Sequence, residues 1–139
     1  MARDFYHSCV RKALEKENWT ITHDPFPINV GRIGYEVDLG AERVIAAEKG
    51  ADKIAVEIKS FVGPSDINEF HRAMGQFNDY EANLDVIEPN RQLFLAVPMN
   101  VWEDFFQEIA IQRAVKRNRT NLIVYDPSSE SIILWHYEQ

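Results

Sequence analysis

The sequence predicts a three-layer α/β or α+β domain in which helices flank a central mixed β-sheet. Three observations support this class. Residues 53–61 form an apolar run typical of a buried strand, helical periodicity precedes and follows the strand-like segments, and turns containing Gly or Pro separate them. The chain has 139 residues, of which 45% are hydrophobic and 27% charged, so we expect one globular domain over residues 1–139.

The first expected element is an amphipathic helix over residues 3–17. Its apolar residues recur at intervals of three and four, and they are Phe5, Tyr6, Cys9, Val10, Ala13 and Leu14. A short strand follows at residues 19–22. Residues 24–27 are expected to leave regular structure, because Pro25 and Pro27 each fix φ and lack a backbone donor.

Residues 35–39 alternate between apolar and acidic side chains, which predicts a further strand. Glu36 and Asp38 would share one face of it, and the apolar residues would share the other. We expect Gly40 to end this strand, residues 44–48 to form a third short strand, and residues 49–52 to make the turn into the 53–61 strand.

A second helix is expected after the break at Gly63 and Pro64. Ser65 has the character of an N-cap, and the helix extends to about residues 80–84. Its apolar stripe consists of Ile67, Phe70, Met74 and Phe77, and Gln76 lies on its other side. A strand at residues 91–97 follows, and Pro98 ends it.

The C-terminal part predicts one more helix and a hairpin. Asn100 has Glu103 three positions on, a variant of the capping box that would open a helix. This helix would carry the apolar residues Trp102, Phe105, Phe106 and Ile109 and end in the basic residues Arg113, Lys116, Arg117 and Arg119. Residues 122–125 and 132–135 would pair around the turn at residues 127–129.

Composition limits the classes of function. The formal net charge of −7 disfavours a protein that grips nucleic acid over a broad basic surface, although it leaves a local acidic metal site open. The lone Cys9 excludes an intramolecular disulfide and fits a reducing compartment. No apolar run approaches the roughly 18 residues of a membrane span, so we expect a cytoplasmic protein without membrane contact.

The strand at residues 53–61 contains two charged residues that require an explanation. Side chains alternate along a strand, so Glu57 and Lys59 share one face with Ala55, while Ile54, Val56 and Ile58 share the other. Burying a carboxylate or an ammonium costs roughly several kcal/mol unless the two groups pair with each other or bind a ligand.

Asp38, Glu57 and Lys59 could form one metal site if their strands are neighbours. Mg²⁺ and Mn²⁺ choose oxygen ligands, usually one or two carboxylates plus water and phosphate oxygens, and Asp38 with Glu57 supplies such a pair. Lys59 would then orient the attacking water or stabilise charge on a phosphate. The alternative is an ordinary Glu–Lys ion pair on an exposed strand, worth at most about 1 kcal/mol.

The run Val56-Glu57-Ile58-Lys59-Ser60 resembles the E-x-K signature of the PD-(D/E)XK nuclease superfamily, and Asp38 is similar to its first acidic position, with Val37 where the superfamily often has proline. More closely, the chain resembles the XisH family, named for the fdxN element excision controlling factor of cyanobacteria. The matching stretches are residues 1–4, 19–25, 38–42, 46–49, 53–61, 63–67, 75–77 and 95–98.

The resemblance implies a restriction-endonuclease-like fold and a set of site residues. Asp38 and Glu57 would bind the metal, and Lys59 would assist attack. Glu48 competes with Asp38 for the first acidic position, although Glu48 lies beside a turn where a solvated charge needs no explanation. Several PD-(D/E)XK subgroups have a Gln on the helix after the E-x-K strand, which makes Gln76 a further candidate; a solvent-facing amide is the alternative.

The resemblance also implies a role in controlling site-specific DNA excision in heterocyst-forming cyanobacteria, together with a small companion protein, XisI. Two functions remain open. One is a Mg²⁺-dependent or Mn²⁺-dependent endonuclease acting on DNA, and the other is a non-catalytic accessory protein that controls a site-specific recombinase through protein contacts. Trp135 and Tyr137 on the last hairpin could face a partner, either the companion or a second copy in a homodimer.

Overall fold

The computed structural model describes residues 2–46 and 50–139. The N-terminal half contains α1 (Ala2–Lys16), β1 (Thr20–His23), β2 (Phe26–Val30), β3 (Ile33–Val37), β4 (Leu39–Ala46) and β5 (Gly50–Ile58). The second half contains α2 (Asp66–Ile87), β6 (Arg91–Pro98), α3 (Met99–Glu103), a 3-10 turn η1 (Phe105–Gln107), α4 (Ile109–Arg117), β7 (Leu122–Asp126) and β8 (Ser131–His136). The helices at 2–16 and 66–87 and the terminal hairpin confirm the predicted elements.

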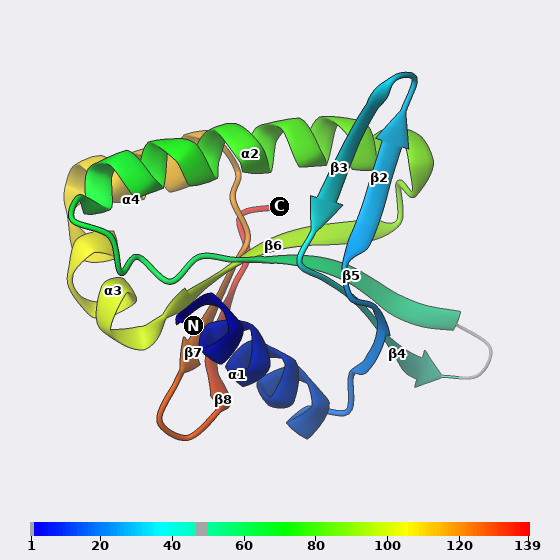
Figure 1. The fold of residues 1–139 in the computed structure, drawn as a ribbon, viewed down its shortest axis with the longest axis horizontal. Helices are drawn as coiled ribbons and strands as arrows, with labels where there is room; N and C mark the ends of the chain where they lie inside the picture. Colours follow the sequence, from blue (N-terminus) through cyan, green and yellow to red (C-terminus); the bar gives the residue numbers. More distant parts are fainter. Residues whose placement is uncertain (1, 47–49) are drawn as a thin grey trace.

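Six strands form the central sheet in the order β1-β4-β5-β6-β7-β8 (Figure 1). The strands β5, β6 and β7 run parallel, whereas the β1-β4, β4-β5 and β7-β8 pairs are antiparallel. The predicted mixed sheet flanked by helices is therefore confirmed. The strands β2 and β3 form a separate two-stranded hairpin, which rises from the sheet beside α2.

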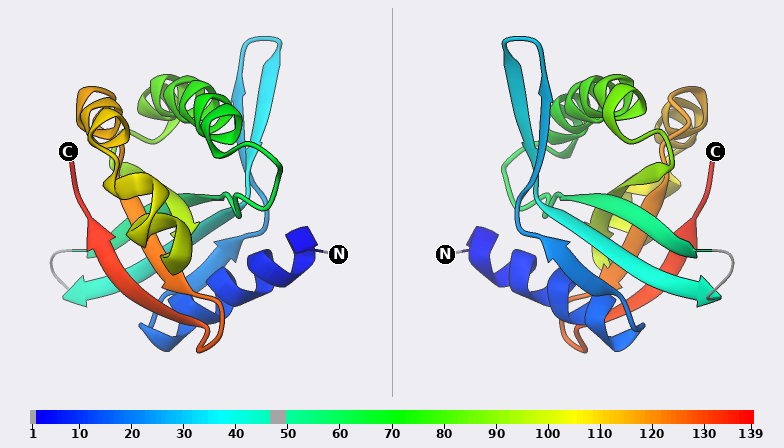
Figure 2. Two further views of the ribbon diagram at one scale, coloured as in Figure 1. Left: turned by 90° about the vertical axis from the view of Figure 1, so that its left-hand side faces the viewer. Right: turned by 90° about the vertical axis from the view of Figure 1, so that its right-hand side faces the viewer.

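Helices cover both faces of the sheet (Figure 2). One face packs against α2, α3, α4 and the β2-β3 hairpin, with a core that includes Ala55, Phe70, Phe77 and Leu95. The other face packs against α1, whose Cys9, Val10 and Leu14 join Ile54 and Val56 in a second core. The alternation predicted for residues 53–61 is confirmed, because Ala55 faces the first core and its neighbours face the second. No helix in the described part is both long and apolar enough to cross a membrane.

The strand predicted at residues 35–39 is instead two strands that meet at Asp38. Val37 ends β3 and packs in the core beneath α2, whereas Leu39 begins β4 and packs in the core beneath α1. The chain therefore passes from one layer to the other at Asp38, so Val37 and Leu39 do not share a face as predicted. An apolar-acidic alternation cannot reveal such a crossing, because each half matches the pattern of a strand.

Four boundary predictions near the first strands are wrong. Phe26 and Pro27 lie in β2, where Pro27 is tolerated because it sits exposed in a two-stranded hairpin. Gly40 does not end a strand but pairs with Ala55 inside β4. The strand expected at residues 44–48 is the end of β4, up to Ala46, and the rest of it lies outside the described residues. Likewise β5 begins at Gly50, within the expected turn.

The helix predicted to open at Asn100 and continue past Ile109 is also wrong. The segment divides into α3, the 3-10 turn and α4, and α3 begins at Met99 with Pro98 as its N-cap and no side-chain capping bond. The aromatic residues of this region pack around Phe61 and Phe70, as with Phe105 and Phe106. This packing bends the chain away from one helix, while Ile109 stays exposed.

Replacing Gly40 and Gly75 by alanine should change stability in opposite directions. A Cβ at Gly40 would lie 2.7 Å from Phe26 Cδ2 and 3.1 Å from His23 Cβ, so Gly40→Ala should lower the free energy of unfolding by about 1–3 kcal/mol. A Cβ at Gly75, on α2, would meet no other atom within 4 Å, so Gly75→Ala should raise the free energy of unfolding by about 0.5–1 kcal/mol. Urea unfolding of both variants measures this difference, and equal effects would contradict the packing described at Gly40.

Candidate active site

The antiparallel pairing of β4 and β5 brings Asp38 and Glu57 together. Leu39 pairs with Val56, so the residues just before and just after them lie opposite each other across the two strands. The Ile58 N–H donates to Asp38 Oδ2 at 2.8 Å, and the Asp38 N–H donates to Glu57 Oε1 at 3.3 Å. Each carboxylate therefore accepts a bond from the backbone beside the other. The two acids therefore lie side by side, as predicted for neighbouring strands.

Lys59 completes this group from the end of β5. Its Nζ lies 3.5 Å from Glu57 Oε2, and its backbone N–H donates to Ala96 O at 2.9 Å, which holds the residue against β6. The side chains of Lys59 and Glu57 are only 22% and 9% exposed. The alternative of a solvated surface pair is therefore wrong, because water does not screen a pair at this depth as it does an exposed one.

Glu57 is held in a strongly perturbed state. Burial raises its pKa most, the negative charge of Asp38 raises it further, and Lys59 opposes both effects only in part, which leaves a pKa of about 7. A carboxyl group with such a pKa in a charged cluster is more typical of a functional site than of a structural ion pair.

Gln76 and Tyr80 lie one turn apart on the same face of α2. Tyr80 adjoins the acidic cluster, since burial and then the charges of Glu57 and Asp38 raise its pKa to about 12. Gln76 is half-buried, and its Oε1 is fully buried with no hydrogen-bond partner among the described residues. The carbonyl oxygen of this amide therefore does not face solvent. Tyr80 was not among the site residues predicted from the sequence, because it matches the pattern of the other buried residues of α2.

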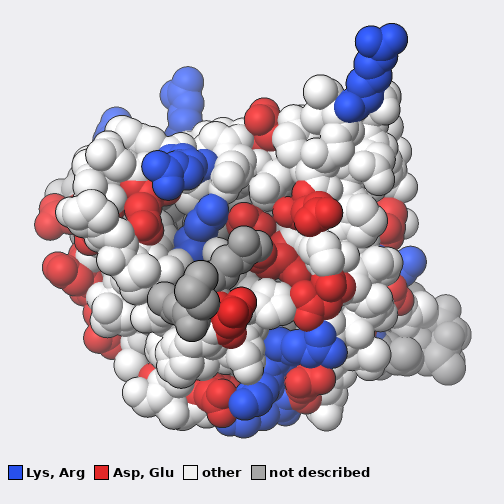
Figure 3. Space-filling model, viewed as in Figure 1, with Lys and Arg blue, Asp and Glu red and all other residues white. Residues whose placement is uncertain are grey.

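Asp38 also lines a polar pocket of about 340 Å³. The other lining residues come from α1, β3 and the β1-β2 turn, and they are Asp4, His7, Asp24, Pro25 and Glu36. Within it, Asp24 accepts bonds from His7 Nε2 at 2.9 Å and from Arg11 Nη1 at 2.6 Å. Acidic side chains lie on the hairpin side of the hollow between α1 and α2, and basic side chains with acidic ones beside them lie on its other side (Figure 3). These residues come from distant segments, so sequence spacing gave no sign that they meet.

The oxygen donors fit a hard divalent cation held by few protein ligands. Asp38 and Glu57 repel each other when both are ionised, and a cation between carboxylates relieves that repulsion. The buried Oε1 of Gln76 is a further oxygen without a partner in the described part. Across residues 2–46 and 50–139 no three His, Cys, Asp or Glu side chains converge as in a multi-ligand metal centre. Glu48, the competing first acid, lies outside the described residues.

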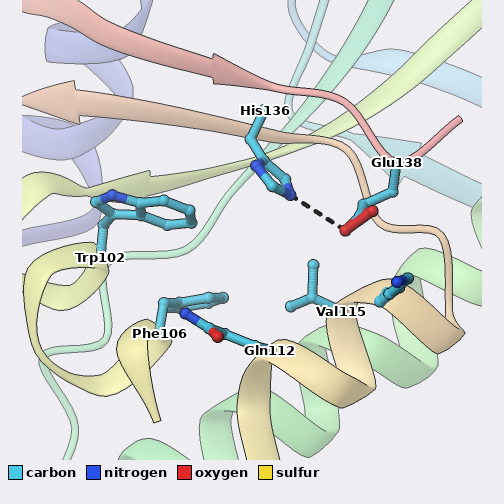
Figure 4. A pocket seen from close by; sticks show the side chains of 7 residues that line it. Trp102, Phe106, Gln112, Val115, His136 and Glu138 are labelled. Atoms are coloured by element: carbon cyan, nitrogen blue, oxygen red, sulfur yellow. Dashed lines mark hydrogen bonds and ion pairs between the residues drawn. The ribbon is translucent and has the colours of Figure 1, made fainter. Parts of the chain in front are cut away.

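A second pocket of about 370 Å³ lies between α3, α4 and β8, and it has a different character (Figure 4). Trp102, Phe106 and Val115 form its apolar wall, and His136 Nε2 pairs with Glu138 Oε2 at 3.2 Å at its rim. Trp102 packs against Phe106, which is buried in the core beneath α2. None of the candidate site residues Asp38, Glu57, Lys59 and Gln76 lines this pocket.

The fold and the site together define a class of protein: a mixed α/β domain with a half-buried Asp, a buried Glu and a lysine where β4 and β5 meet. The chain belongs to the XisH family, since the family's sequence profile, described as "XisH protein", matches residues 1–133. No curated protein matches the sequence.

Two solved structures are closely similar to the chain. One is an XisH family protein from Nostoc punctiforme PCC 73102, with 40% sequence identity and a TM-score of 0.87 over 95% of this chain and 98% of that one. The other is an fdxN element excision controlling factor protein from Anabaena variabilis, with 41% identity and a TM-score of 0.87 over 96% and 98%. The resemblance identified from the sequence is therefore confirmed at the level of the family.

The raised pKa of Glu57 should make stability depend on pH. Between about pH 4.5 and pH 7 the folded state keeps a proton that the unfolded state releases, so stability falls as pH rises through this window. Glu57→Gln removes this loss. The free energy of unfolding of Glu57→Gln, relative to the unsubstituted protein, should therefore rise by up to about 3 kcal/mol across this window.

Urea unfolding at about pH 5 and about pH 8, with EDTA present, measures this change. The exposed Glu103 on α3 provides a control, because Glu103→Gln should shift stability equally at both pH values. A constant difference between Glu57→Gln and the unsubstituted protein at both pH values would show that Glu57 ionises normally in the folded state.

Proposed function

We propose that this protein is an excision controlling factor that regulates site-specific recombination of a DNA element, and that it hydrolyses DNA phosphodiester bonds at a metal-dependent site on a PD-(D/E)XK nuclease-like fold. The first part rests on membership of the XisH family and on likeness to a structure described as an fdxN element excision controlling factor. The second part rests on one observation: Asp38, Glu57 and Lys59 meet at the end of a buried strand.

In the proposed reaction, Asp38 and Glu57 would hold Mg²⁺ or Mn²⁺, which would supply a Lewis acid and an activated water when bound. Asp38 is oriented by the Ile58 N–H, so its carboxylate has one fixed direction. Lys59 releases Glu57 Oε2 and donates instead to a phosphate oxygen, where negative charge grows as water adds to phosphorus and the bond to the leaving oxygen breaks. Gln76 supplies from α2 a carbonyl oxygen, Oε1, that has no hydrogen-bond partner among residues 2–46 and 50–139.

The second candidate is a non-catalytic accessory protein that acts through protein contacts. The net charge of −7 and the acidic pocket beside Asp38 favour it, because both repel a DNA backbone unless a cation is bound. Its partners would be an XisI-like companion, a site-specific recombinase or a second copy of the chain. The edge strand β8 pairs only with β7 within the described part and exposes Ile133 and Leu134, so it is where such a partner would add.

Calorimetric titration of Mn²⁺ and Mg²⁺ tests the metal site. The unsubstituted protein should bind a cation, Glu57→Ala should lose this binding, and Glu103→Ala should retain it, because only Glu57 is one of the two proposed ligands. Supercoiled plasmid should be nicked only by proteins that bind the cation, with and without the companion protein. If the unsubstituted protein binds no cation and leaves plasmid intact with its companion present, the proposed chemistry is wrong.

Lys59→Ala separates metal binding from chemistry. The variant should bind the cation at least as tightly, because an ammonium group beside the ligands repels it, yet nick plasmid about a hundredfold more slowly. Lys116→Ala, on α4, is the matched control and should nick at the unsubstituted rate. If excision in cells proceeds normally with Lys59→Ala while nicking is lost, the accessory function accounts for excision control.

A further inference from the structure

A small polar pocket of about 140 Å³ adjoins the candidate active site on the side of Lys59. Its lining residues are Ile58, Lys59, Ser60, Glu69 and Arg72, so it joins the end of β5 to the first turns of α2. Neither Asp38 nor Glu57 lines it. Pockets for whole small molecules are roughly 300–1,000 Å³, so this one suits a single group with the size of a phosphate.

The loop that forms this pocket is held in a demanding conformation. Phe61 has a φ of +56°, a left-handed value that costs a side chain of this kind about 1–3 kcal/mol. Its ring is buried between Phe105 and Phe106, with centroids 6.0 and 5.6 Å away, and this packing offsets the cost. The backbone therefore turns sharply just after Ser60, which leaves Lys59 and Ser60 facing the beginning of α2.

The acid in the pocket, Glu69, accepts a hydrogen bond from the loop, whereas Arg72 forms no ion pair with a described residue. Glu69 Oε1 accepts a bond from the Gly63 N–H at 3.1 Å, and a Cβ at Gly63 would come too close to the same oxygen. Glu69 therefore holds the loop in place. Arg72 is exposed, and no carboxylate among the described residues lies within ion-pair distance of it. The guanidinium is thus available for an anion from solution.

We infer that Arg72 and the Ser60 hydroxyl, beside Lys59, bind one phosphate of the DNA backbone. This phosphate would be adjacent to the one that is cleaved at Asp38 and Glu57. This inference rests on the proposed function. A guanidinium presents paired donors that match two phosphate oxygens, which makes arginine suited to this contact. The acidic pocket beside Asp38 repels the same backbone, so charge places the DNA strand on the α2 side of the hollow (Figure 3).

Salt-dependent DNA binding tests the inference. Fluorescence anisotropy with a labelled duplex compares Glu57→Gln, a background expected not to cleave, with the same protein carrying Arg72→Ala. The second substitution should weaken binding about tenfold at low salt, and the slope of log K against log salt should fall by about 0.9, because one phosphate contact is lost. Arg72→Lys should recover most of the slope and part of the affinity, since it keeps the charge but not the paired donors.

Arg113→Ala in the same background is the control, because Arg113 is exposed on α4 outside both polar pockets. Equal affinity and slope for Arg72→Ala and the background, or an equal loss for Arg113→Ala, would overturn the inference. Absence of any DNA binding by the background would overturn it too, whereas metal binding in calorimetry would still stand. If nicking fails but the Arg72 effect is present, the phosphate site stands and the proposed hydrolysis does not.

Inorganic phosphate separates a backbone contact from a site for the free ion. Millimolar phosphate should displace the duplex from the Glu57→Gln background no more than an equal ionic strength of chloride does. Preferential displacement by phosphate that Arg72→Ala abolishes would assign the pocket to free phosphate and overturn the backbone assignment.

Discussion

The exchange of hydrogen bonds between Asp38 and the end of β5 is the constraint on which the site depends. Asp38 sits where the chain leaves the β2-β3 hairpin and enters the sheet, and its carboxylate accepts the Ile58 N–H while its own N–H donates to Glu57. One residue therefore fixes the crossing between two layers and the position of the second acid. The backbone bonds also satisfy part of the demand of carboxylates that are shielded from water.

Electrostatics oppose this arrangement even though hydrogen bonds hold it. Burial and the charge of Asp38 raise the pKa of Glu57 to about 7, and the single ammonium of Lys59 compensates only in part. A structural ion pair would gain stability from a more complete neutralisation, as at Arg91, which is buried and contacts both Glu42 and Glu88. The two clusters therefore differ: Arg91 is neutralised by two carboxylates, whereas the charge of Glu57 is opposed by burial and by Asp38.

Local patterns predicted those parts of the fold where one segment dictates its own structure. The stripe of α2 at Phe70, Met74 and Phe77, its Ser65 cap and the two-sided burial of β5 were correct, because periodicity and capping reflect neighbouring residues. Ile67, also predicted in the stripe, is exposed at the first turn of the helix. Predictions failed where packing overrode the pattern: the strand that breaks at Asp38, the proline accepted in β2, and the helix that divides around Phe105 and Phe106. Among the site residues, the sequence grouped Asp38, Glu57 and Lys59 on the condition that their strands are neighbours, and the pairing of β4 with β5 meets this condition.

The sequence by itself determined the class of fold, the acid pair with its lysine and membership of the XisH family, since alternation and motif spacing are properties of the chain. Only the tertiary structure decided that Tyr80 adjoins the acids, that Gln76 Oε1 is buried with no hydrogen-bond partner among the described residues, and that Asp4, His7 and Asp24 share a pocket with Asp38. The same is true of Arg72 and Ser60 beside Lys59. These groups meet because a sheet and the helices on its two faces bring distant segments together, and no local pattern records such contacts.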